Sequence, residues 1–131
     1  MTTPTQPDSS GSVEEWVLKA EEDLEAAAHL GGDSDRFRNS ASFHYQQAIE
    51  KLMKAVLVKG GHVPPRTHDL VELFDLLEGH GVRVAATRSD LRLLSTGAVY
   101  ARYPGYRVSP DEFADLARIS GAIWSVLRPL V

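Results

Sequence analysis

Residues 39–61, NSASFHYQQAIEKLMKAVLVKGG, contain the pattern that decides the fold. At 100° per residue, one broad apolar face collects Ala41, Tyr45, Ala48, Ile49, Leu52, Met53, Ala55 and Val56. An apolar arc of nearly half the circumference suits a helix that packs against two or more neighbours, so this stretch is predicted to be the central helix of a bundle. The opposite sector holds His44, Gln47, Glu50, Lys51 and Lys54, with Glu50 spaced to pair with Lys54 at i,i+4. By pattern alone, this sector is typical of a solvated face.

The residues around this helix predict where it begins and ends, and place another helix before it. A helix is expected to open at the capping box Ser12-Val-Glu-Glu15 and to stop at Gly31-Gly32. Asp33 or Ser34 is expected to cap the central helix, which should end at Gly60-Gly61. Residues 1–11 carry nothing to bury and are predicted to be a disordered tail.

Three further turns introduce the remaining helices. After the turn 62–66, which contains two prolines, Thr67 is the expected N-cap of a third helix, with Asp69 in its first turn. A fourth helix is expected to follow the cap at 87–90 and to end at Pro104-Gly105.

Ser109-Pro-Asp-Glu112 is the strongest helix start in the chain, with an N-cap, a proline at the first helical position and a Glu that completes a capping box. Pro129 marks the end of this fifth helix. Alternation with a period of two does not persist anywhere, so strands are not predicted. We therefore expect an all-α fold, a single five-helix bundle over residues 12–131.

Composition excludes several classes of protein. The chain has 131 residues, 43% of them hydrophobic and 24% charged, which is ordinary for one soluble globular domain. It has no cysteine, hence no disulfide, no thiolate nucleophile and no Cys-based zinc site, which is compatible with a cytoplasmic protein. No apolar run is long enough to span a membrane, and the N-terminus does not resemble a signal peptide.

The familiar catalytic and nucleotide-binding motifs are also absent from the sequence. It lacks HExxH, GxxxxGK[ST], GxSxG and GxGxxG. None of the five histidines lies three or four residues from another, so we predict neither a metal site nor a cofactor.

The charge is unevenly distributed along the chain. The net charge of −4 argues against a protein that coats nucleic acid through bulk electrostatics. Residues 1–79 carry 7 Lys/Arg against 14 Asp/Glu, and residues 80–131 carry 7 against 4. A local basic surface in the second part is therefore compatible with the acidic total.

Three short stretches stand out when they are taken together. QQAIEKLMKA spans residues 46–55, THDL spans 67–70 and ARYP spans 101–104. In this order, and on these predicted elements, they resemble the HEPN family, the "higher eukaryotes and prokaryotes nucleotide-binding" domains. The resemblance covers roughly residues 13–128, and the all-α bundle of that family agrees with the helix pattern derived above.

The resemblance implies partners and activities. HEPN domains form homodimers with a polar cleft between the subunits, and many act beside a minimal nucleotidyltransferase as a toxin–antitoxin pair. Many are RNases with an Arg followed, after four to six residues, by a His near the start of a late helix. This chain departs from that pattern, because Arg107, Val108 and Ser109 occupy the positions where Arg102 should find its histidine.

The departure weakens the prediction of nuclease activity. Metal-free RNA cleavage needs a base for the 2′-hydroxyl proton and a cation for the phosphorane, and arginine supplies only the second. Arg38 and His44 do match the spacing, but they lie at the start of the central helix, and roughly one such match is expected by chance. A base would otherwise have to be His44, His68 or a carboxylate.

Ligand binding without chemistry is a second class of function. The predicted nucleotide- or phosphate-binding residues are Gln47, Lys51, Lys54, His68, Arg102, Tyr103, Tyr106 and Arg107. The two lysines and two arginines would form one cation cluster for phosphate, provided that the end of the fourth helix approaches the central helix. The two tyrosines would stack on a base. Each residue also has an ordinary structural role open to it, such as capping, core packing or solvation.

We therefore predict a nucleotide- or RNA-related binding protein that acts as a homodimer with a minimal nucleotidyltransferase partner. Two alternatives stay open. One is a metal-independent endoribonuclease toxin that uses a non-standard histidine. The other is a purely structural module, in which the polar sector of the central helix is a partner surface and the acidic first helix meets a basic partner.

Overall fold

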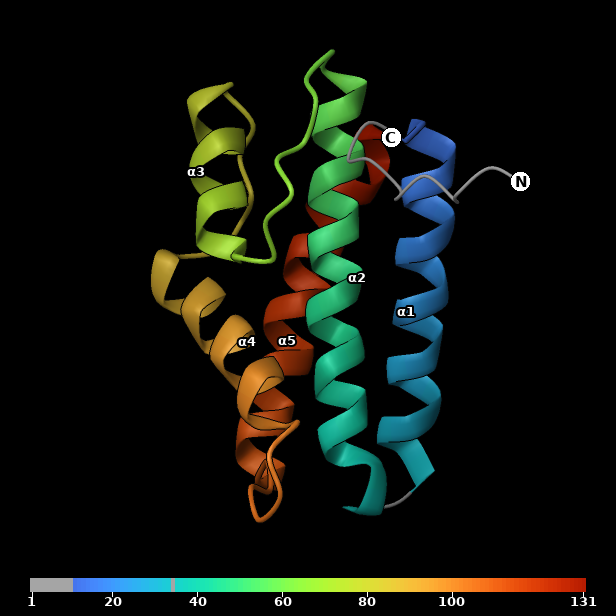
Figure 1. Ribbon diagram of the computed structural model, residues 1–131, viewed down its shortest axis with the longest axis vertical. Coiled ribbons are helices and arrows are strands. Elements are labelled where there is room, and N and C mark those ends of the chain that lie inside the picture. The colour runs from blue at the N-terminus through green and yellow to red at the C-terminus, as the bar shows by residue number, and fades with distance from the viewer. Residues whose placement is uncertain (1–10, 34) are drawn as a thin grey trace, which may run out of the picture.

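The computed structural model describes residues 11–33 and 35–131. These parts of the chain contain five α-helices (Figure 1). They are α1 (Val13–Asp33), α2 (Arg38–Lys59), α3 (Leu70–Gly79), α4 (Arg88–Tyr100) and α5 (Pro110–Leu127), with short 3₁₀ helices η1 (Asp35–Phe37) and η2 (Arg128–Leu130). Those residues contain no strand, so the predicted all-α five-helix fold is confirmed. The predicted tail, residues 1–11, lies outside the described residues except for Gly11.

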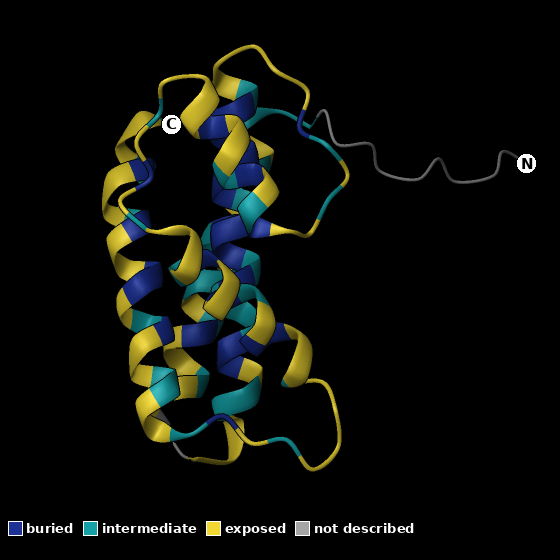
Figure 2. Ribbon diagram, turned by 90° about the vertical axis from the view of Figure 1, so that its left-hand side faces the viewer, coloured by how far each residue is buried: buried dark blue, intermediate teal, exposed yellow. Residues whose placement is uncertain are grey.

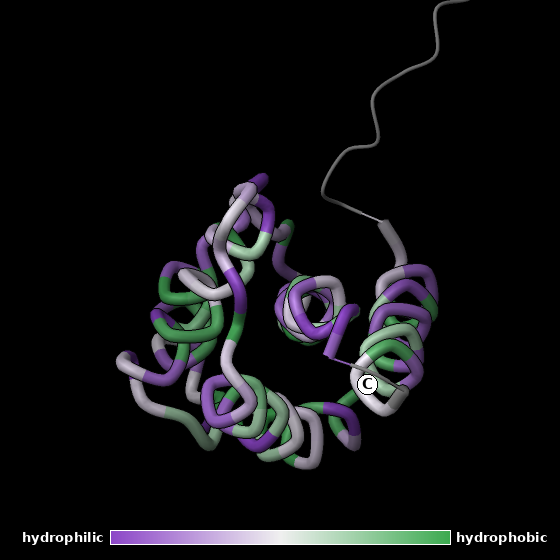
Figure 3. The backbone as a smooth tube through the Cα atoms, turned by 90° about the horizontal axis from the view of Figure 1, so that it is seen from below, coloured by the Kyte–Doolittle hydropathy of each residue, from purple (hydrophilic) through white to green (hydrophobic). Residues whose placement is uncertain are grey.

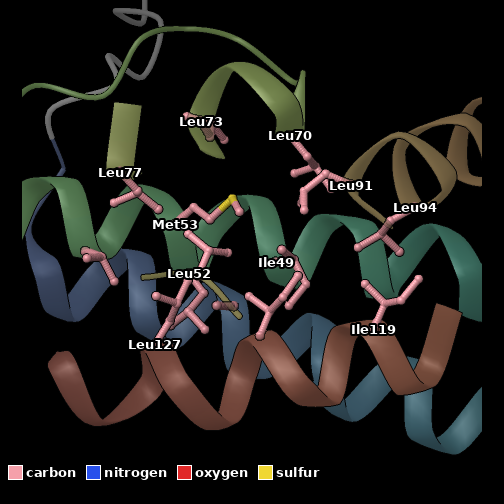
Figure 4. Packing of buried hydrophobic residues seen from close by; sticks show 14 of the residues in the cluster. Ile49, Leu52, Met53, Leu70, Leu73, Leu77, Leu91, Leu94, Ile119 and Leu127 are labelled. Atoms are coloured by element: carbon pink, nitrogen blue, oxygen red, sulfur yellow. The ribbon is translucent and has the colours of Figure 1, made fainter. Parts of the chain in front are cut away.

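Helix α2 is the centre of the bundle, as its broad apolar face predicts. It contacts each of the other four α-helices, with α1 on one side and α3, α4 and α5 on the other (Figures 1 and 3). Ile49, Leu52 and Met53 are fully buried and meet leucines and isoleucines of α3, α4 and α5 (Figure 4). Along the bundle, buried residues face inward and exposed residues cover the outer faces (Figure 2).

The polar sector of α2 is not the solvated face that the pattern suggested. Twelve of its 22 residues are buried, and Glu50 and Lys54 are among them. They are only 3% and 4% exposed, because α1 and the segment before α3 cover this part of the helix.

Three of the predicted N-caps form as expected. The backbone N–H groups of Ser12 and Glu15 each donate to the other's side chain, at 3.3 and 3.1 Å, and Thr87 and Asp90 form a complete capping box. The Ser109 hydroxyl accepts a hydrogen bond of 3.1 Å from the Glu112 backbone at the start of α5. Such caps satisfy backbone donors that would otherwise lack partners.

The predicted end of the first helix and the predicted start of the central helix are wrong. Helix α1 runs through Gly31-Gly32 to Asp33. Gly31 makes room for a neighbouring ring there, since an added Cβ would lie 2.5 Å from Phe113. Helix α2 begins after Phe37, which makes no side-chain cap. Asp33 is still within α1, and Ser34 lies outside the described residues.

The N-cap of α3 is Asp69 rather than Thr67. Its carboxylate accepts a hydrogen bond from the Val71 backbone, while the Thr67 hydroxyl accepts one from the Asp69 backbone. Thr67 therefore closes the turn that leads into the helix. The predicted end of α2 is confirmed, with Gly60 at the C-cap and Gly61 at φ 86°, in the left-handed region.

Replacing Ile49 by Ala should lower the free energy of unfolding by about 2–5 kcal/mol, because it removes a fully buried side chain where four helices meet. Urea denaturation followed by circular dichroism would measure this change. Leu18→Ala, at a position 56% exposed on α1, is the matched control and should change it by less than about 1 kcal/mol. Equal losses in the two variants would contradict the central position of α2.

Candidate functional site

A cleft of about 750 Å³ opens where α2, the segment before α3 and the end of α4 meet. Its lining residues are Phe43, Gln46, Gln47, His68, Asp69, Ser95, Ala98, Val99, Arg102 and Tyr103. Six of these come from the three stretches that stood out in the sequence, at 46–55, 67–70 and 101–104. Segments more than 50 residues apart in the chain thus share one surface.

Asn39 attaches the segment after α4 to the first turn of α2. Its Nδ2 donates a hydrogen bond of 2.7 Å to the Tyr106 carbonyl, and its Oδ1 accepts one of 2.8 Å from the Val108 backbone. Arg38 adds a hydrogen bond of 2.6 Å from Nε to the Val108 carbonyl. The end of α4 therefore does approach α2, as the binding hypothesis required, but at residues 38–43 of that helix.

A buried carboxylate lies beneath the cleft. Glu50 Oε2 is 3.4 Å from Lys54 Nζ, and Glu50 Oε1 accepts a hydrogen bond of 3.2 Å from Gln46. The Lys54 ammonium also lies 5.4 Å from the centre of the Trp16 ring of α1. Gln46 donates a second hydrogen bond, of 3.3 Å, to the His68 carbonyl. The charge of Glu50 is therefore balanced and hydrogen-bonded, as burial requires.

His68 connects this buried group to the cleft. Its Nδ1 lies 3.1 Å from both carboxylate oxygens of Glu50, yet its side chain is 83% exposed. A carboxylate accepts from an imidazole N–H, so this contact fixes the proton on Nδ1. Nε2 is then the ring nitrogen that remains for solvent or a ligand.

Arg102 and Tyr103 lie at the opposite edge of the same cleft. The Arg102 guanidinium lies over the ring of Phe43, 4.5 Å from its centre, and the residue is exposed. Stacking on an aromatic face leaves the N–H edge of a guanidinium available to an anion. Tyr103 is 59% exposed, so its ring is open to a planar ligand.

Lys51 and Lys54 do not line the cleft. Lys51 Nζ is 2.6 Å from Asp23 of α1, and Lys54 is the buried partner of Glu50. At about 1.5 Å per residue, the two lysines lie roughly 12 and 16 Å along α2 from Phe43, where Arg102 is held. The single recess expected from two lysines and two arginines is therefore not formed within one chain.

Tyr106 and Arg107 also lie outside the cleft lining. The Tyr106 hydroxyl donates a hydrogen bond of 3.0 Å to Glu112 Oε2, and this bond, together with partial burial and the carboxylate charge, raises the pKa of Tyr106. This contact occupies the Glu112 side chain, which was expected to complete the capping box of α5. Arg107 is exposed on the same loop. Nucleotide binding by Lys51, Lys54, Tyr106 and Arg107 stays a prediction.

Arg38 and His44, the pair with the nuclease-like spacing, have separate partners. Arg38 pairs with Asp35 at 2.6 Å and binds the Val108 carbonyl, whereas His44 Nδ1 lies 2.8 Å from Asp23 of α1. They therefore do not form one site. In the described part of the chain, no cluster of three or more His, Asp or Glu could hold a metal ion. No helix there is both long and apolar enough to cross a membrane.

Comparisons with known proteins agree with this architecture. The sequence model of the family described as "HEPN domain" matches residues 13–130. A solved structure described as "ST0689, an archaeal HEPN homologue" is similar, with a TM-score of 0.53 at 21% identity, over 92% of this chain and 95% of that one. At this identity the likeness shows the fold. No curated protein matches the chain.

Replacing Lys54 by Met should lower the free energy of unfolding by about 3–5 kcal/mol, because Glu50 would keep a buried charge without its partner. Lys51→Met is the matched control. Its pair with Asp23 is more exposed, and Asp23 keeps His44 as a second partner, so this loss should be smaller than that of Lys54→Met. Urea denaturation at neutral pH would measure both, and similar losses would contradict the buried-charge interpretation.

Proposed function

Because this chain belongs to the HEPN domain family, we propose that it is a nucleotide- or RNA-related binding protein whose ligand occupies the cleft between α2 and the end of α4. It acts as a homodimer, and its partner is a minimal nucleotidyltransferase of a toxin–antitoxin type pair. The support for the ligand site is the convergence of three separate stretches on one cleft.

The groups at the cleft suit a phosphorylated base. Arg102 offers a planar set of donors to a phosphate, and the exposed ring of Tyr103 offers a face for stacking. Gln47 donates one hydrogen bond to Gln46, which leaves its carbonyl and its second N–H for a base edge. His68 adds a nitrogen that can accept or donate.

Metal-independent RNA cleavage is the second candidate, and one observation favours it. His68 is held by a carboxylate through Nδ1 and shares the cleft with Arg102. That arrangement supplies a base and a cation without the Arg–His spacing of the nuclease members. Degradation of a short RNA in the presence of a chelator, lost in His68→Ala, would establish this candidate.

The exposed side chains also indicate where partners would bind. The polar sector of α2 is largely covered within the chain, which favours partner surfaces elsewhere over the structural-module alternative. At the edge of the cleft, the lining residues Val99 and Tyr103 and the neighbouring Tyr100 are 54%, 59% and 49% exposed, which suits contact with a second copy. On α1, Glu14, Glu15, Glu22 and Glu25 are exposed and suit a basic partner.

Adding ATP should raise the melting temperature of the protein, and Arg102→Ala should abolish most of that increase, because Arg102 is the cation at the cleft. Lys51→Ala is the control, since its ammonium is held by Asp23 outside the cleft. Differential scanning fluorimetry would measure the shifts. A loss in Lys51→Ala with none in Arg102→Ala would move the site to the face against α1.

Sedimentation equilibrium should give twice the chain mass of 14.4 kDa. Val99→Asp should shift the mass toward one chain, because it places a charge on the exposed apolar strip at the edge of the cleft. Val126→Asp, at a position 37% exposed on α5, is a matched control and should remain dimeric. A wild-type protein of single-chain mass would rule out the homodimer.

A further inference from the structure

Glu50 is one buried carboxylate between two basic side chains. Lys54 lies 3.4 Å from its Oε2, and Nδ1 of His68 lies 3.1 Å from both oxygens. The lysine is 95% buried as a side chain and balances the carboxylate by itself. His68 therefore contacts a carboxylate that already has a positive partner in Lys54, and Nε2, on the far side of its ring, faces away from this contact.

The charges that face His68 leave the cleft close to neutral. Besides the balanced Glu50–Lys54 pair, the lining carries the carboxylate of Asp69 and the guanidinium of Arg102. Asp69 caps α3 by accepting a hydrogen bond of 2.9 Å from the Val71 backbone, so it stays in place as a negative group. A ligand with two negative charges thus meets one cation, Arg102, whose charge is partly balanced by that of Asp69.

We propose that a terminal phosphate monoester binds in this cleft with uptake of one proton by His68, a proposal that rests on the nucleotide-binding function above. The proton comes from solvent and adds to Nε2. The protonated ring then donates through Nε2 to a phosphate oxygen while Nδ1 keeps its bond to Glu50. Histidine is the side chain whose charge changes most readily near neutral pH, and Glu50 stabilises the resulting imidazolium.

This arrangement favours a terminal phosphate monoester over a phosphodiester link. A terminal phosphate carries about −1.5 to −2 charges near neutral pH, whereas a phosphodiester carries one. Arg102 alone matches a diester. His68 becomes protonated, and so supplies a second cation, only when a dianion binds. The ligand is therefore a phosphate monoester, either on a free nucleotide or at the end of an RNA.

Isothermal titration calorimetry at pH 7.5, in two buffers of different ionisation enthalpy, tests the proton uptake. At this pH the phosphate of adenosine monophosphate is almost fully dianionic, so any proton taken up resides on the protein. We expect net uptake with this ligand and an affinity that falls as the pH rises, by no more than about tenfold per pH unit, the limit for linkage to one proton. We expect adenylyl-adenosine, a diester without a terminal phosphate, to bind about tenfold more weakly at pH 7.

Two histidine variants separate this mechanism from a general effect of histidine. His68→Gln keeps a hydrogen-bonding side chain at an exposed position and should abolish the uptake, the pH dependence and the preference for the monoester. His44→Gln is the matched control, because His44 also contacts a carboxylate, Asp23, through Nδ1 but does not line the cleft. It should behave like the wild type.

A pair of short RNAs, with and without a 5′-phosphate, distinguishes the two sources of the monoester. Tighter binding of the phosphorylated RNA than of adenosine monophosphate would support the proposal and assign the ligand to an RNA end. Binding that requires Arg102 but shows no proton uptake and no change in His68→Gln would overturn it, leaving the proposed function intact. Absence of binding by all four ligands would overturn both.

Discussion

The buried carboxylate of Glu50 is the constraint on which the arrangement of this bundle depends. A charged group inside a helical core is tolerated only when its charge is balanced and its oxygens have partners. Lys54 and Gln46 supply these from the same helix, and His68 supplies a third contact from the segment before α3. The contact that His68 makes with Glu50 thus also positions the segment that leads from α2 into α3. The imidazole ring of His68 comes to the surface there, at the cleft.

A second polar residue, Asn39, fixes the other edge of the cleft. It binds the backbone of the α4–α5 connection on both sides of Arg107, at Tyr106 and Val108. Phe43, one turn further along α2, then carries the guanidinium of Arg102. The cleft therefore exists because two parts of α2 each bind a distant segment through buried or half-buried hydrogen bonds. The apolar core between these points sets their separation.

The sequence predicted the fold and part of the candidate site. What it predicted depends on residues close in the chain, and what it missed depends on distant segments. Helix number and the caps at Ser12, Thr87 and Ser109 depend on neighbours in the chain, so local patterns revealed them. The pairing of Glu50 with Lys54 was also visible as an i,i+4 spacing. Its burial was not, because a polar residue covered by another helix has the same pattern as a solvated one. Asn39 gave no signal at all, since its partners are backbone atoms more than 60 residues away.

Magnitudes decide which cations are available to an anionic ligand. A hydrogen bond from a charged donor contributes about 1.5–3 kcal/mol. Moving Lys54 to a phosphate would leave Glu50 unpaired in the core, at a cost of about 3–5 kcal/mol, so this lysine stays where it is. Lys51 could leave Asp23 at a smaller cost, because Asp23 keeps His44 as a second partner, but it lies roughly 12 Å along α2 from the residue that holds Arg102. Arg102 and His68 are exposed, share one cleft and need no such exchange. The cations and donors open to a ligand in the cleft are therefore an arginine with a permanent charge and a histidine held by a buried carboxylate.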